Sequence, residues 1–203
     1  MTAATAAALG EPGDDPIAAF HRLFAAAQAA GGADPTAAAL ATAAADGSPS
    51  VRIVLVKQVD EAGLRFFTNR GSRKACELAN NPRAALCFWW PAIAWQFRAE
   101  GGVEPLPDAD SDAYFSSRAR DSQIGAWASR QSAPLASRDV LEERCAQVAA
   151  RYADAPVPRP PFWGGYLLVP ERIELWSGRE HRLHDRWLYR RVAEGWSMER
   201  LYP

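Results

Sequence analysis

The stretch SVRIVLVKQVDEAGLRFFTN, residues 50–69, decides how this chain folds. Its first ten residues, 50–59, are rich in β-branched and other apolar side chains, which predicts a strand. The residues from Asp60 to Gly63 form a turn, and LRFFTN, residues 64–69, predicts the next strand. Two strands joined by so short a turn predict an antiparallel sheet, and the flanking segments show how that sheet is completed.

The flanking segments carry both helix and strand patterns. Apolar residues recur at helical spacing from Pro16 to Ala30, and Gly31-Gly32 ends that helix. Further helices are predicted over residues 72–79, 108–118, 123–129 and 137–152, and further strands over 38–43, 84–90, 93–103, 164–169, 172–177, 182–190 and 195–202. Strands before and after a helical block, joined by hairpin turns, predict an antiparallel barrel with attached helices, a mainly β fold of the α+β class.

The composition is that of a globular protein without an overall charge. We expect residues 16–203 to form a single domain and residues 1–15, rich in Ala, Gly and Asp, to form a disordered tail. The net charge of −1 argues against recruitment of nucleic acid or of an anionic membrane, and no run of about 18 apolar residues could span a bilayer. The N-terminus lacks the basic region of a secretory signal, and the three cysteines form no CxxC pair. We therefore expect a cytoplasmic protein whose anion sites are local clusters of Arg and Lys.

The sequence Ser72-Arg73-Lys74 places two cations in the first turn of a predicted helix, where the helix dipole favours acidic residues. An exposed misplacement costs only about a few tenths of a kcal/mol, so chance is one explanation. A phosphate bound at the helix N-terminus is the other, because it would neutralise the cations and use the free N–H groups. The residues alone leave both explanations open.

A second polar cluster consists of Tyr114, Arg118 and Ser122, which are spaced four residues apart. If the helix continues through them, all three share one face. A phenol, a guanidinium and a hydroxyl aligned in this way suit a phosphate monoester. A polar face turned to solvent is the commoner outcome for such a pattern.

A third cluster is RLHDR, residues 182–186. Strand alternation would put Arg182, His184 and Arg186 on one face, where they repel one another unless an anion, a π-system or paired acidic residues lie against them. His181 and His184 have no third ligand in sight, so no metal site is expected.

Arg52 and Lys57 pose a problem of parity. They are five residues apart, so regular alternation places them on opposite faces of their strand. Both can serve one site only through a β-bulge or a second subunit. Lys57 lies within the apolar run IVLVKQV, which favours a functional lysine over a solvated one.

From about Asp15 to Pro203 the sequence resembles the pyridoxamine 5′-phosphate oxidase family. The stretches that carry the resemblance are RIVLVK at 52–57, FFTNRGSRK at 66–74, SDAYFSSR at 111–118, SQIGAWASRQS at 122–132, VPRPPFWGGY at 157–166, IELWSG at 173–178, RLHDR at 182–186 and the terminal RLYP. Phe67, Trp95 and Ala119 stand where Tyr, Arg and Pro are usual in the family.

The resemblance implies a split β-barrel flavoprotein that works as a homodimer, with non-covalent FMN at the subunit interface. The FMN-binding residues that it implies are Arg52, Ile53, Val54, Leu55, Val56, Lys57, Phe67, Thr68, Arg73, Lys74, Gln96, Gln131, Ser132, Trp176 and Arg186. The substrate-binding residues that it implies are Lys57, Tyr114, Arg118, Ser122, Arg182 and His184, of which Arg182 and His184 would be catalytic. Binding at an interface would bring Gln131 and Ser132 in from the partner subunit.

The activity implied by the resemblance is oxidation of pyridoxamine 5′-phosphate, pyridoxine 5′-phosphate or both to pyridoxal 5′-phosphate, with O₂ reduced to H₂O₂. The alternatives are a sister flavin oxidase of the phenazine-biosynthesis type and a non-catalytic carrier of FMN or pyridoxal phosphate. The intact stretches RLHDR and SQIGAWAS favour the vitamin B6 enzyme. The sequence does not indicate which of the two phosphates is preferred.

Overall fold

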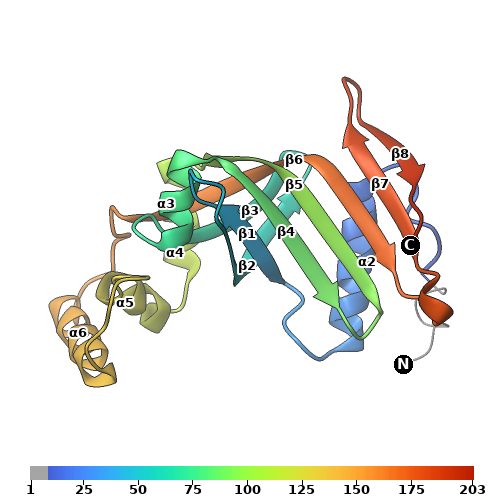
Figure 1. The fold of residues 1–203 in the computed structure, drawn as a ribbon. Helices are drawn as coiled ribbons and strands as arrows, with labels where there is room; N and C mark the ends of the chain where they lie inside the picture. The colour runs from blue at the N-terminus through green and yellow to red at the C-terminus, as the bar shows by residue number, and fades with distance from the viewer. Residues whose placement is uncertain (1–8) are drawn as a thin grey trace.

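The computed structural model describes residues 9–203, which form a closed barrel with appended strands and helices (Figure 1). The strands pair in the order β3-β2-β1-β4-β5-β6-β7-β8, and a further β3–β6 pairing closes β1 to β6 into a barrel. The strands are β1 (Ala37–Ala43), β2 (Pro49–Asp60), β3 (Gly63–Asn69), β4 (Arg83–Trp90), β5 (Trp95–Pro105), β6 (Trp163–Ser177), β7 (Asp185–Arg191) and β8 (Trp196–Arg200). All these pairings are antiparallel, so the predicted antiparallel barrel is confirmed.

The helices are α2 (Pro16–Ala30), α3 (Arg73–Asn80), α4 (Asp108–Ser117), α5 (Arg120–Ala128), α6 (Arg138–Arg151) and the short 3₁₀ helix η1 (Glu180–Arg182). Helix α2 begins after Asp15, whose carboxylate accepts hydrogen bonds from the N–H groups of Ile17 and Ala18. It ends at Gly31, which has a φ of 71° that favours glycine. Helices α5 and α6 lie at one end of the molecule, and β7 and β8 lie at the other (Figure 1).

The barrel interior is filled by apolar side chains that alternate along the strands. The rings of Phe66, Phe88 and Phe97 are fully buried. Phe20 of α2 packs edge-on against the rings of Phe88 and Phe97, at centroid distances of 5.2 and 4.9 Å. Helix α2 is therefore part of the core, and each such buried ring contributes roughly 1.5–3 kcal/mol. None of the helices in the described part of the chain has the length and hydropathy needed to cross a membrane.

Strand β6 is a single strand of 15 residues, where the sequence predicts two strands over 164–169 and 172–177. It serves three neighbours, because it pairs with β3, β5 and β7. Its register with β5 shifts between Glu100 and Gly101, and such a bulge lets a long strand bend around a barrel. A Cβ atom at Gly101 would lie 2.0 Å from the carbonyl oxygen of Val169, so this close approach requires glycine.

The helical block breaks between Tyr114 and Ser122. Helix α4 ends at Ser117 and α5 begins at Arg120, because Arg118 between them has an extended backbone with φ −74° and ψ 149°. Tyr114, Arg118 and Ser122 could share one helical face only on a continuous helix. The helix is broken at Arg118, so they do not share one.

Strand β7 begins at Asp185, later than the predicted strand over 182–190. The residues before it turn through η1, in which His181 and Arg182 have φ values of 56° and 63°. The prediction that Arg182, His184 and Arg186 share one strand face is therefore wrong. Leu183 in this segment stays 68% exposed, so the segment buries no side chain that would hold it in a strand.

Residues 9–15 lie against β7, β8 and α2. The Tyr189 hydroxyl donates to the carbonyl oxygen of Gly13 at 2.5 Å, and Glu11 forms an ion pair with Arg200. The Arg22 guanidinium donates to the carbonyl oxygen of Glu11 at 3.1 Å. The rest of the predicted tail, residues 1–8, lies outside the described residues.

Candidate functional site

Strand β2 has one open edge. It pairs with β1 over residues 49–55 but reaches β3 only at Val56. The N–H group of Val56 donates to the carbonyl oxygen of Thr36 at 2.9 Å, so every second residue counted from Val56 turns its N–H group toward β1. The backbone N–H and C=O groups of Val51, Ile53 and Leu55 therefore face the opposite, open side.

The stretch of β2 that runs from Arg52 to Lys57 ends in a bulge. The register between β2 and β3 shifts between Val56 and Gln58, so Lys57 lies at the irregularity. Arg52 and Lys57 both line the same pocket. A bulge was one of the two arrangements under which this pair could share a site.

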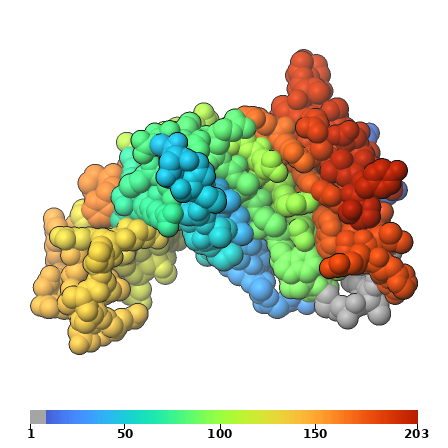
Figure 2. All heavy atoms as spheres, viewed as in Figure 1, coloured from blue at the N-terminus to red at the C-terminus, as the bar shows by residue number. Residues whose placement is uncertain are grey.

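This pocket has a volume of about 970 Å³, and Figure 2 shows the surface hollowed between α5–α6 and the barrel. It is lined by β2, β3, the first turn of α3, the α4–α5 region and Trp163. The predicted residues that line it are Arg52, Ile53, Val54, Leu55, Lys57, Phe67, Thr68, Arg73, Lys74, Tyr114, Arg118, Ser122, Gln131 and Ser132. Val56 instead points into the barrel core, where it is 4% exposed.

Lys74 is a buried cation in this pocket. Its residue is 7% exposed, and its Nζ donates to the hydroxyls of Thr68 at 3.2 Å and Ser72 at 3.3 Å. Burial, and next the charge of Arg52, lower the pKa of Lys74. Ser72 turns its hydroxyl toward Lys74 and does not cap α3 with it. A cation surrounded by hydroxyls at a helix N-terminus is the environment that a phosphate would complete.

Arg118 is a half-buried cation of the pocket. Its guanidinium lies over the rings of Trp163 and Phe115, at 4.9 and 5.7 Å from their centroids. Its Nη1 atom is buried without a hydrogen-bond partner in the described part of the chain. Burial lowers the pKa of Arg118 and raises that of Tyr114, whose ring stacks on Phe67 at 4.1 Å. The three residues Tyr114, Arg118 and Ser122 thus line one pocket although the helix breaks between them.

Gln131 and Ser132 also line the pocket of their own chain. The Gln131 side-chain oxygen accepts hydrogen bonds from the Thr68 hydroxyl at 3.0 Å and the Asn69 N–H at 3.4 Å. The Ser132 hydroxyl accepts one from the N–H of Arg73 at 3.1 Å. Within one chain these two residues lie beside Thr68 and Arg73, because the loop after α5 folds back over the start of α3.

The other predicted residues lie on β5, β6 and β7 and in the segment just before β7. Gln96, Trp176 and Arg186 lie directly opposite one another in the three strands. The Trp176 ring lies 4.4 Å from that of His184, and Arg186 donates two hydrogen bonds, of 2.7 and 3.1 Å, to the buried carboxylate of Glu174. We call the five residues Gln96, Trp176, Arg182, His184 and Arg186 the β7 cluster.

The β7 cluster is separate from the pocket in a single chain. Within the described residues, the pocket lining includes no member of this cluster: Gln96, Trp176, Arg182, His184 and Arg186. Strand β7 and helix α5, which carries Ser122, lie toward opposite ends of the molecule (Figure 1). Within residues 9–203, no three His, Cys, Asp or Glu side chains lie together as a metal site would require.

Comparisons with known proteins fit this arrangement. Residues 24–152 match the sequence model of a family described as pyridoxamine 5′-phosphate oxidase. A protein of Anaeromyxobacter dehalogenans (strain 2CP-C) named pyridoxine/pyridoxamine 5′-phosphate oxidase is 60% identical over 93% of this chain and 96% of its own length. A Rubrobacter xylanophilus protein of the same name is 53% identical over 98% of this chain and 93% of its own length. The chain belongs to the pyridoxamine 5′-phosphate oxidase family. It is an oxidoreductase, as its relatives in that family are.

A solved structure also resembles the whole chain. This is PhzG from Burkholderia lata 383 in complex with tetrahydrophenazine-1-carboxylic acid, with a TM-score of 0.90 and 32% identity over 97% of this chain and 96% of that one. An FMN-binding protein related to the same oxidase family, from Nostoc punctiforme PCC 73102, has the same fold, with a TM-score of 0.73 and 21% identity over 91% of this chain and 97% of that one.

The family also assigns a role to the C-terminal strands. Residues 163–203 match a region described as the pyridoxine 5′-phosphate oxidase C-terminal dimerisation region. This region contains every residue of the β7 cluster except Gln96.

Sequence reasoning missed three residues that shape these sites, namely Glu77, Trp163 and Glu174. Glu77 stands four residues after Arg73, which is the spacing of a helical ion pair, so a signal was present. Glu174 is a charged residue in the apolar run IELW, the same kind of signal that Lys57 gives. Trp163 has no comparable signal, because a tryptophan beside glycines is equally typical of an ordinary core.

Proposed function

We propose that this chain is an FMN-dependent oxidase that converts pyridoxamine 5′-phosphate, pyridoxine 5′-phosphate or both to pyridoxal 5′-phosphate. The observation that carries the proposal is one pocket with two sets of cations, each suited to a phosphate. The first set, near the start of α3, consists of Arg52, Arg73 and Lys74. The second set consists of Lys57 and Arg118, which lie on other parts of the pocket lining. A phosphorylated cofactor and a phosphorylated substrate would use both sets. The names of the relatives at 53–60% identity support the same assignment.

The groups around Lys74 fit the phosphate of FMN. The buried ammonium has hydroxyl partners but forms no ion pair within the described residues. A phosphate would restore the interactions that this cation loses on burial. The N–H groups in the first turn of α3 would add further donors.

The open edge of β2 fits the ring of FMN. The backbone groups of Val51, Ile53 and Leu55 offer alternating donors and acceptors to the polar rim of a flat ring. The side chains of Val51 and Ile53 are 68% and 66% exposed, which leaves apolar surface beside the pocket for the ring or a partner subunit to cover.

Arg118, Tyr114 and Ser122 fit the phosphate of the substrate. Their guanidinium, phenol and hydroxyl are all donors, and the unpartnered Nη1 of Arg118 lacks only an acceptor. Lys57 on the bulge of β2 would lie beside both ligands.

The chain's own residues would bind and orient the reactants. When bound, FMN would supply the redox chemistry, a two-electron oxidation of the substrate carbon that bears the amine or alcohol, with O₂ reduced to H₂O₂ and, for the amine, with water consumed and ammonia released. We assign Arg182 and His184 to positioning the substrate ring, and Arg186 to the flavin, where its charge would favour the reduced ring. The His184 Nδ1 atom accepts a hydrogen bond from the N–H of Arg179 at 3.1 Å, which orients the imidazole.

This assignment requires two subunits. The β7 cluster and the pocket are separate in one chain, so we propose that the partner's cluster completes each pocket in a homodimer with FMN at the interface. The match of residues 163–203 to a dimerisation region supports this arrangement.

The test is to purify the protein and to measure flavin content and H₂O₂ release with each vitamin B6 phosphate. A yellow protein that releases FMN on denaturation and turns over either phosphate is the expected result. A colourless protein that cannot be reconstituted with FMN would refute the proposal.

Two alternatives give distinct results in the same assay. The 32% identity to PhzG favours a sister oxidase as the second candidate, and tetrahydrophenazine-1-carboxylic acid should then be the better substrate. A carrier would bind FMN and release no H₂O₂ with any of these compounds.

A further inference from the structure

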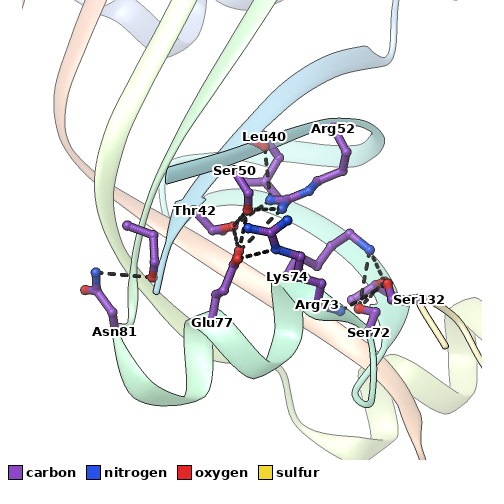
Figure 3. A network of polar contacts seen from close by, with 12 residues as sticks. Leu40, Thr42, Ser50, Arg52, Ser72, Arg73, Lys74, Glu77, Asn81 and Ser132 are labelled. Atoms are coloured by element: carbon purple, nitrogen blue, oxygen red, sulfur yellow. Dashed lines mark hydrogen bonds and ion pairs between the residues drawn. The ribbon is translucent and has the colours of Figure 1, made fainter. Parts of the chain in front are cut away.

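Glu77 lies at the centre of a polar network that includes Arg52 and Arg73 (Figure 3). It projects from α3 and is 7% exposed. Its Oε2 atom accepts hydrogen bonds from the hydroxyls of Thr42 and of Ser50, the latter at 2.6 Å, and lies 3.4 Å from Nη2 of Arg52. Its Oε1 atom accepts a hydrogen bond from Nε of Arg73 at 2.8 Å. One carboxylate therefore joins α3 to β1 and β2.

Both arginines of this network line the pocket, whereas Glu77 does not. Arg52 is further fixed by hydrogen bonds from its Nη1 to the Thr42 hydroxyl at 2.6 Å and to the carbonyl oxygen of Leu40 at 3.2 Å. Arg73 is 62% exposed, and within the described residues its side chain is held by Glu77. Without the carboxylate, a long exposed side chain of this kind would sample many rotamers.

The charges of the network also suit a phosphate. Arg52, Arg73 and Lys74 are three cations around one carboxylate, which leaves a net of two positive charges. A phosphate monoester carries about −1.5 to −2 at neutral pH. With no phosphate present, the carboxylate offsets part of the repulsion among three closely placed cations.

We infer that Glu77 is a positioning residue, which holds Arg52 and Arg73 in place for the phosphate of FMN without touching it. This inference rests on the proposed function. It predicts that Glu77 matters for the phosphate of the cofactor and not for its ring.

The test compares FMN with riboflavin, which lacks the phosphate. The full-length apoprotein is titrated with each compound, and the dissociation constants are measured by quenching of flavin fluorescence. Glu77→Gln keeps the size of the side chain but removes its charge. Glu142→Gln is the matched control, because Glu142 pairs with Arg138 at the same i,i+4 spacing on α6 and does not line the pocket.

Glu77→Gln should raise the Kd for FMN at least about tenfold and change the Kd for riboflavin by less than about twofold. Glu142→Gln should change neither. An unchanged or lower Kd for FMN in Glu77→Gln would overturn the inference, and so would an equal rise for both compounds, because that is the effect of a purely structural residue. If the wild-type chain does not bind FMN, the proposed function fails and this inference fails with it.

A second variant covers the case in which Glu77→Gln does not fold. Thr42→Val keeps the shape of a side chain outside the pocket lining but removes the hydroxyl that bridges Glu77 and Arg52. It should weaken FMN binding, by a smaller factor, and leave riboflavin binding unchanged. An unchanged ratio of the two dissociation constants in this variant would overturn the inference.

Discussion

Among the described residues that have a buried side-chain N or O atom without a hydrogen-bond partner, Arg118 is the one that lines the pocket. A guanidinium nitrogen that is buried without an acceptor costs about 1–3 kcal/mol, and the rings of Trp163 and Phe115 compensate only in part. An acceptor on a ligand in the pocket would offset this cost. At the scale of the residue, the proposed substrate site therefore depends on this guanidinium more than on the polar neighbours that share its pocket.

Replacing Arg118 with Met keeps most of its apolar bulk and removes its donors and charge. We expect kcat/KM for pyridoxamine 5′-phosphate to fall about 100-fold, which corresponds to roughly 3 kcal/mol of transition-state binding. The Kd for FMN should change little, because Lys74 and its neighbours hold that phosphate. Steady-state kinetics and flavin titration measure the two effects separately. Arg120→Met is the control, because Arg120 binds the backbone carbonyls of Tyr152 and Ala155 instead. Equal losses in both variants would contradict the assignment.

Glu77 also predicts how stability depends on pH. Hydrogen bonds from the hydroxyls of Ser50 and Thr42, followed by Arg73, lower the pKa of Glu77 from 4.5 to about 2 in the folded protein. A carboxylate with a lowered pKa stabilises the fold above its unfolded pKa, and that contribution is lost as the pH falls from about 4.5 toward 2. The unfolding free energy of the wild-type apoprotein should exceed that of Glu77→Gln by on the order of 2 kcal/mol at pH 6, and the gap should narrow by pH 3. Urea unfolding at both values measures it, and a gap independent of pH would show that Glu77 stabilises the fold by packing alone.

At the scale of the element, the sequence predicted the helices and strands whose positions are set by apolar periodicity, capping residues and turn residues. Helix α2 and the pairing of β2 with β3 follow from apolar spacing and from turn residues, and both were predicted within a residue or two. Bulges and breaks depend on how strands fit around a closed barrel, which no local pattern encodes. The bulge at Lys57, the long bent β6 and the turn at Arg182 all belong to that class. The resemblance named the candidate site residues as one set, and only the fold shows that one pocket gathers fourteen of them and leaves the β7 cluster apart.

The bend of β6 gives a test at this scale. Gly101 lies at the β5–β6 bulge, where an added Cβ would meet the carbonyl oxygen of Val169 at 2.0 Å, whereas a Cβ at the adjacent Gly102 would meet nothing within 4 Å. Gly101→Ala should therefore destabilise the fold by at least about 2 kcal/mol, because backbone cannot move aside as a side chain does. Gly102→Ala should stay within about 0.5 kcal/mol of the wild type. Thermal unfolding of the two variants checks the difference, and similar melting temperatures would show that the bulge tolerates a side chain.

At the scale of the whole molecule, the proposed site is shared between subunits. The pocket beside β2 includes no residue of the β7 cluster, and α5 and β7 lie toward opposite ends of the molecule (Figure 1). Together the pocket and the cluster hold all the residues that the family resemblance assigns to one reaction except Val56. A two-fold dimer places two surfaces of each subunit against the same two surfaces of its partner. Each active site would then combine the pocket of one chain with the β7 cluster of the other, and neither chain alone would be active.

Mixing two inactive variants tests this sharing. Arg118→Met damages the pocket and Arg182→Leu damages the β7 cluster, and each homodimer should lose about 100-fold in kcat/KM while keeping its fold. In a mixed dimer with shared sites, one site receives both damaged halves and the other receives two intact halves. Random reassociation of equal amounts makes half of the dimers mixed, so about a quarter of the wild-type activity should return. Measuring H₂O₂ release after unfolding and refolding the mixture reports this recovery, and refolding each variant alone is the control. If each site lay within one chain, every site in the mixture would carry one damaged half, and activity would stay at the level of the separate variants.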